Sequence, residues 1–90
     1  MLVRNENFEI VNLSDEYMAI PVGEEATAFH GVVSLSEPVA FLLGLLDKPL
    51  SKDDILEKML NEYAVEESTM KNDLDAITIK LRDFNLLLDT

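Results

Sequence analysis

The chain has 90 residues and a formal net charge of -11, and its length fits a single domain over residues 1–90 with one core. Nucleic acid and anionic membranes are both polyanions, so this charge disfavours either of them as a partner. The chain has no cysteine and no apolar run of the roughly 20 residues that span a membrane, so we expect a cytoplasmic protein without disulfides.

A β-hairpin is predicted near the start of the chain. Residues 8–11 (FEIV) and 17–22 (YMAIPV) are β-prone runs, and the roughly five residues between them include asparagine, serine and aspartate, which favour turns. Side chains alternate between the two faces of a strand. Met18, Ile20 and Val22 are therefore expected to face the core together.

A third strand is predicted over residues 28–35 (AFHGVVSL). Phe29, Val33 and Leu35 would share its inner face, and His30 is expected on the solvent face. As the only histidine, His30 has no second imidazole and no thiol with which to form a zinc site or a nucleophile–base pair. The acidic pairs fall at turns and helix starts, where carboxylates are common. We therefore expect no enzyme activity, no metal site and no cofactor.

Three helices are predicted after the third strand. The first two are expected over residues 36–46 and 51–63, and each begins at a serine that can act as its N-cap. The third is expected to start near Ser68 and to stop at Asn85. Its apolar stripe alternates steps of four and three residues: Met70, Leu74, Ile77, Leu81, Phe84 and Leu88.

This order of elements predicts an α+β fold, in which a three-stranded antiparallel β-sheet is followed by three α-helices in a winged-helix-like outline. In most DNA-binding proteins of that outline, the third helix enters the major groove and needs a positive face. Here the basic and acidic residues of that helix nearly balance: Lys71, Lys80 and Arg82 against Asp73, Asp75 and Asp83. A winged-helix DNA-binding or regulatory protein is kept as an alternative, as is a structural dimerisation module that uses the apolar stripe as a seam.

The order of motifs resembles the PqqD-like family, also called RiPP recognition elements. The resemblance covers nearly the whole chain and lies in NLSDEYMAIPVGEEA, then FHGVVSLSEPVAFLLGLLDKPLSKDDILEKMLNEYAV, then DLDAITIKLRDFNLL. In that family a strand runs straight into a capped apolar helix that ends in leucine and aspartate, here Leu46 and Asp47. Two departures are Leu43, where the family commonly has tryptophan, and Asn85, where it has glycine.

The resemblance implies a peptide chaperone. Such proteins bind the leader segment of a ribosomally made precursor peptide as an added strand beside their third strand. They present it to a modifying enzyme, which in the namesake pathway is a radical S-adenosylmethionine enzyme. Leu74 and Lys80 are the residues of the third helix most expected to touch the peptide, whereas Ile77, Leu81 and Phe84 are expected to pack mainly in the core. The protein is expected to be a monomer or a homodimer. The implied peptide-binding residues are Val32, Val33, Ser34, Leu35, Leu74, Ile77, Lys80 and Leu81.

Overall fold

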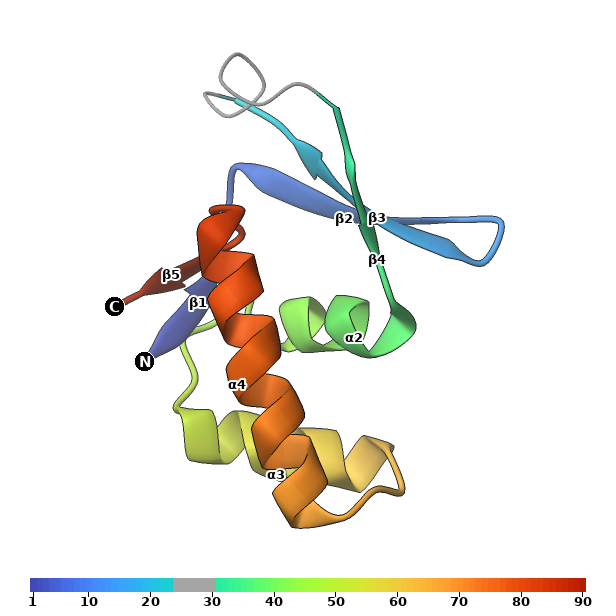
Figure 1. Cartoon of the computed structure of the whole chain (residues 1–90). Coiled ribbons are helices and arrows are strands. Elements are labelled where there is room, and N and C mark those ends of the chain that lie inside the picture. Colours follow the sequence, from blue (N-terminus) through green and yellow to red (C-terminus); the bar gives the residue numbers. More distant parts are fainter. Residues whose placement is uncertain (24–30) are drawn as a thin grey trace.

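The computed structural model describes residues 1–23 and 31–90, and within them it confirms the α+β fold. A three-stranded sheet lies at one end of the molecule, and helix α4 runs from it toward helix α3 at the other end (Figure 1). The described elements are β1 (Leu2–Arg4), β2 (Phe8–Leu13), β3 (Glu16–Pro21), β4 (Val33–Leu35), α2 (Glu37–Leu45), α3 (Lys52–Glu62), α4 (Glu67–Asp83) and β5 (Leu87–Asp89).

The predicted hairpin is confirmed, but its connection is tighter than expected. Strands β2 and β3 pair as far as Leu13 and Glu16, so only Ser14 and Asp15 form the turn. Both turn residues have positive φ, 52° and 66°. This conformation suits the twist of the flanking strands and closes a hairpin with two residues. The expectation of about five connecting residues was therefore wrong.

The core face of β3 is the opposite of the one predicted. Ala19 is completely buried and pairs with Ile10, which packs against the core. Because side chains alternate along a strand, Met18 and Ile20 point away from that core, and the prediction for Met18, Ile20 and Val22 was wrong. Helix α2 packs on the sheet at β2 and β3. A small alanine on this face lets a helix approach the backbone closely.

Strand β4 is shorter than the predicted third strand. It covers Val33–Leu35 and pairs antiparallel with β3, with Ser34 opposite Met18. Val32 precedes the strand, and its side chain is 51% exposed. The beginning of the predicted strand, with Phe29 and His30, lies outside the described residues.

The helix boundaries follow the capping residues closely. Ser51 caps α3, since its Oγ accepts a hydrogen bond from the backbone N–H of Asp54 at 3.1 Å. Ser36 is the N-cap residue of α2, although its side chain makes no capping hydrogen bond. Helix α4 begins at Glu67, one residue before the predicted start, and Asn85 ends it with φ at 65°. The predicted stop at Asn85 is confirmed.

One hydrophobic core unites the described helices and strands. Leu43, at the position where the family commonly has tryptophan, is completely buried in it. Met70, Leu74 and Leu81 of the α4 stripe are buried in the same core, so three of the six residues of the predicted dimer seam pack within the chain itself. Leu88 does not belong to that stripe, because it lies on β5. No described helix has the length and apolarity required to cross a membrane.

A second small sheet was not predicted from the sequence. Strands β1 and β5 pair antiparallel with Val3 opposite Leu88, which brings the two ends of the chain side by side (Figure 1). Asn5 follows β1 and is buried. Its Nδ2 donates to the backbone oxygen of Asn85 at 2.8 Å, and its Oδ1 accepts from the backbone N–H of Asn7 at 3.0 Å. These contacts fix the C-terminal end of α4 to the sheet side of the molecule.

Candidate functional site

A groove of about 250 Å³ lies between β4 and the C-terminal half of α4. It brings together six of the eight predicted peptide-binding residues, from two segments more than 40 positions apart in the sequence. Helix α2 and the end of α4 contribute further lining residues that were not predicted from the sequence. The lining residues are Val33, Ser34, Leu35, Ser36, Val39, Ile77, Lys80, Leu81 and Phe84.

The floor of this groove is apolar and continuous with the core. Leu81 is buried, and Val33, Leu35, Val39 and Ile77 are partly buried and pack against the core cluster. Val33 and Leu35 are two positions apart on β4, so they share one face of the strand. Apolar side chains of a bound segment would be removed from water here, which is the main favourable term in most peptide association.

The rim of the groove carries one aromatic ring and one positive charge. Phe84 is 44% exposed, so its expected place in the core was wrong. It is the C-cap residue of α4, with φ -84° and ψ 1°, so it lies where the helix ends and the apolar stripe no longer follows the core. Its position directly before the helix-stopping asparagine was the available sequence signal. Among the described lining residues, Lys80 is the only charged one, and its side chain is exposed.

The backbone of β4 offers an open edge beside this groove. The strand order is β2-β3-β4, so β4 pairs with β3 on one side and with no other strand among the described residues. Edge strands present N–H and C=O groups that another chain can pair with. The opposite edge, at β2, is also unpaired within the described part of the chain. Ile10 and Asn12 of β2 line another pocket together with Phe41 and Tyr63, whereas the groove formed with α4 lies beside β4.

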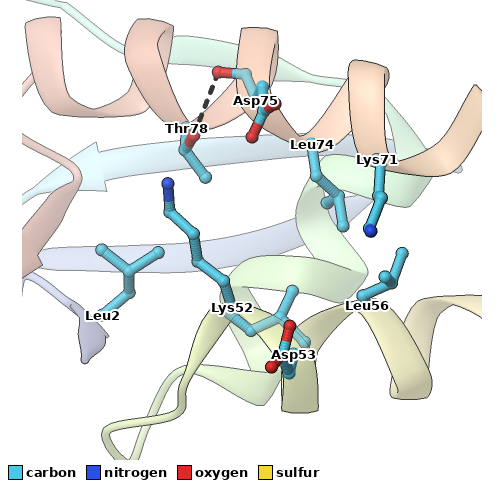
Figure 2. Close-up of a pocket in the computed structure, with 9 residues that line it drawn as sticks. Leu2, Lys52, Asp53, Leu56, Lys71, Leu74, Asp75 and Thr78 are labelled. Atoms are coloured by element: carbon cyan, nitrogen blue, oxygen red, sulfur yellow. Dashed lines mark hydrogen bonds between the residues drawn. The ribbon is translucent and has the colours of Figure 1, made fainter. Parts of the chain in front are cut away.

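Two predicted site residues lie elsewhere. Val32 does not line the groove. Leu74 is buried and lines a different cavity, where it points toward Leu56 and Lys71 (Figure 2). Leu74 precedes Leu81 by seven residues, or about 10 Å along a helix axis. At that height α4 packs on α3 rather than on β4. The regular spacing of the apolar stripe does not show that its two ends contact different elements.

A polar contact between α2 and the end of α3 lies beside the hairpin. The Tyr63 hydroxyl donates to Glu37 Oε1 at 3.4 Å, and its ring meets Phe41 edge-on with centroids 5.8 Å apart. Partial burial, and then the nearby Glu37 carboxylate, raise the pKa of Tyr63 above its ordinary value. In residues 1–23 and 31–90, no three His, Cys, Asp or Glu side chains are grouped as metal ligands.

Comparisons with known proteins agree with this architecture. The family model of coenzyme PQQ synthesis protein D (PqqD) matches residues 10–87. The solved structure of TbiB1 in complex with the TbiA(beta) leader peptide has a similar fold, with a TM-score of 0.76 and 18% sequence identity over 98% of this chain and 96% of that chain. No curated protein matches the sequence. Since the family match spans most of its length, the chain belongs to the PqqD family.

Proposed function

We propose that this protein binds the leader segment of a ribosomally made precursor peptide and presents it to a modifying enzyme. The observation that carries the proposal is the open edge of β4 beside an apolar groove formed with α4. Membership of the PqqD family supports it. So does the fold shared with TbiB1, a protein whose structure was solved with a leader peptide bound.

Strand addition uses both parts of the site. The peptide adds as an antiparallel strand, and its backbone pairs with the outward N–H and C=O groups of Val33–Leu35. Alternate peptide side chains then enter the groove between Leu35 and Ile77, and the others face solvent. Phe84 covers the apolar side chains at one end, and the Lys80 ammonium can donate a charge-assisted hydrogen bond to one carboxylate of the leader.

Rigid placement of this edge lowers the cost of binding. Strand β4 leads directly into α2, with only Ser36 between Leu35 and the first helical residue. Leu42 and Leu43 of that helix are completely buried, so the helix holds the end of the strand against the core. An edge that is ordered before the peptide arrives loses less conformational entropy on binding.

The chemical step belongs to the partner enzyme in this proposal. The leader held at β4 leaves the remainder of the precursor free to reach an active site on that enzyme, which we expect to be of the radical S-adenosylmethionine type or another peptide-modifying class. Tethering raises the effective concentration of the substrate at the enzyme without any catalytic group on this chain.

The DNA-binding alternative finds little support on α4. Arg82, one of its three basic residues, forms an ion pair with Asp89 at 2.9 Å. The carboxylates of Asp73 and Asp75 are exposed on the same helix, within a chain of net charge -11. Such a surface would repel phosphates, and phosphate contacts supply most of the affinity of non-specific DNA binding.

Proline substitutions along β4 test the proposal. N–H groups of successive strand residues point to opposite edges, so Val33→Pro and Leu35→Pro form one class and Ser34→Pro the other. One class removes hydrogen bonds to β3 and lowers the melting temperature. The other class keeps the fold but removes a backbone N–H group that would donate to the peptide, so its variants should lose most leader affinity.

Leader affinity is measured by calorimetric titration with the cognate leader peptide, and the stability of each variant is measured by a thermal melt. Ser34→Ala, which keeps its N–H group, is the matched control and should bind like the parent. If the well-folded proline class binds the leader with parental affinity, the peptide does not pair with β4, and the proposal is wrong.

A further inference from the structure

A second cavity lies between α3, α4 and β1, in a part of α4 that does not line the leader groove. Its volume is about 300 Å³, which is at the lower end of the range for small-molecule sites. Figure 2 shows Leu74 entering it from α4, Leu56 from α3 and Leu2 from β1. Residues from three segments distant in the sequence therefore form one concave surface.

The interior of this cavity is apolar. Leu2, Ile55, Leu56 and Leu74 line it, and each is buried in the core cluster. Thr78 lines the same wall, but its hydroxyl already donates to the backbone oxygen of Asp75 at 3.0 Å (Figure 2). A ligand seated here would contact mainly aliphatic carbon and would gain affinity by displacing water from that surface.

Two lysines stand over this apolar surface. The side chain of Lys52 extends across the cavity toward Thr78, and that of Lys71 descends from α4 toward Leu56 (Figure 2). The chain has five lysines in all, so two of them converge on one small cavity. Asp53 and Asp75 also line it. Within the described residues, however, the only ion pair closer than 4.0 Å is Arg82–Asp89, which leaves both ammonium groups without a carboxylate partner.

Helix geometry does not account for the position of Lys52. It is the first residue of α3, and a cation at the N-terminal end of a helix meets the positive end of the macrodipole. Asp53 and Asp54 suit that end of the helix instead. The ammonium group of Lys52 is therefore placed over the cavity at some cost to the helix.

We propose that this cavity binds a small apolar acid, with an aliphatic or aromatic body and one carboxylate. The body fills the surface formed by Leu2, Leu56 and Leu74, and the carboxylate lies between the ammonium groups of Lys52 and Lys71, which donate charge-assisted hydrogen bonds. The chain has a net charge of -11, so repulsion grows with each negative charge on the ligand. This disfavours phosphates and polyanions and favours a singly charged acid.

A carboxylate of this kind has two sources, which are a free short-chain acid and the C-terminal residue of a peptide. The experiment titrates the full ¹⁵N-labelled chain, followed by NMR, with octanoate, octanol and octylamine. Parallel titrations use N-acetyl-glycyl-leucine with a free or an amidated C-terminus. Octanoate should move the amide resonances of Leu2, Leu56 and Thr78 and bind about tenfold or more tightly than octanol, since one charge-assisted hydrogen bond is worth roughly that factor.

The variants separate this site from a general affinity for apolar acids. A Lys52→Gln, Lys71→Gln double variant should weaken octanoate binding about tenfold or more. Lys58→Gln, an exposed lysine of α3 outside the cavity, is the matched control and should bind octanoate like the parent. If octanoate binds and the free-carboxylate dipeptide does not, the ligand is a free acid. If the free-carboxylate dipeptide binds, the ligand is the C-terminus of a peptide.

Three results would overturn the proposal. The first is equal binding of octanol and octanoate together with equal binding of the amidated and free dipeptides. The second is unchanged octanoate binding in the double variant. The third is that neither carboxylate probe moves the amide resonances of the cavity residues. Resonance changes confined to β4 and the end of α4 would count as this result. The leader-binding proposal is unaffected by any of them, because the proline variants of β4 test it separately.

Discussion

Truncation of two side chains on α4, Leu74→Ala and Phe84→Ala, should have opposite effects on stability and on leader binding. Both residues belong to one apolar stripe in the sequence, but the structure separates them. Leu74 is 8% exposed between α4 and α3, whereas Phe84 is 44% exposed at the rim of the leader groove. The first change removes core contacts, and the second removes contacts that only a bound peptide would complete.

The sizes of the two effects follow from burial. Leucine-to-alanine changes in a core cost about 2–5 kcal/mol. We expect Leu74→Ala near the lower end, because Leu74 already borders a cavity. Phe84→Ala should cost about 1 kcal/mol of stability, since a fully buried side chain contributes roughly 1.5–3 kcal/mol and Phe84 is only partly covered. If its ring is an anchor for the peptide, leader affinity should fall by about 2 kcal/mol, or roughly 30-fold.

Urea denaturation measures the first quantity, and calorimetric titration with the leader peptide measures the second. The titration should be made at a temperature where the Leu74→Ala variant remains folded. That variant should then bind the leader within about threefold of the parent. A stable Leu74→Ala variant with little leader affinity, together with a Phe84→Ala variant of parental affinity, would show that the peptide lies along the α3 side of α4, and would refute this assignment of the groove.

Three further predictions concern single contacts. Asn5→Ala should lower the free energy of unfolding, measured by urea denaturation, by about 1–3 kcal/mol, because it removes two hydrogen bonds of the buried Asn5 side chain, one to the Asn85 carbonyl and one from the Asn7 N–H group; exposed Asn61→Ala is the control. Because the pKa of Tyr63 is raised above 10.0, the folded state holds this proton more tightly than the unfolded state. Stability should therefore fall as the pH rises past 10, and melts of Tyr63→Phe should lack that part of the fall. Lys80→Glu should weaken binding of a leader with an acidic side chain by roughly three- to tenfold, and less in high salt; a salt-independent loss would contradict the charge contact.

Elements that depend on local chemistry were predictable from the sequence. Ser51 and the N–H group of Asp54 are three residues apart, and Asn85 adopts a left-handed conformation that few other residues accept. The capping serines and the helix stop therefore gave α2, α3 and the end of α4 within one or two residues. The edge position of β4 followed from the motif order of the PqqD family.

Features that depend on distant contacts were not predictable in the same way. Strands β1 and β5 are three residues each and pair across almost the whole chain, with Leu2 opposite Asp89. Neither segment is long enough to show a period. The core face of β3 was predicted wrongly because the alternating positions with the larger apolar side chains were assigned to the core. The buried position of this strand is occupied by the small residue Ala19. The spacing of a helical stripe shows that its residues share one face of the helix, but it does not show which element each residue contacts. Leu74 and Phe84 belong to one stripe, yet Leu74 packs toward α3 and Phe84 lies at the groove beside β4.

Local and overall charge place different demands on the leader peptide. The groove presents Lys80 as the only charge among its described lining residues, while the chain as a whole carries -11. A carboxylate directly at Lys80 is therefore favourable, but acidic residues farther along the peptide would meet an acidic protein. A fitting leader has apolar residues at alternate positions, at most one acid near Lys80, and neutral or basic flanks. The attraction of basic flanks acts over a Debye length of about 8 Å at physiological salt. Added salt should therefore slow association with the leader, while the apolar contacts in the groove keep the dissociation rate almost unchanged.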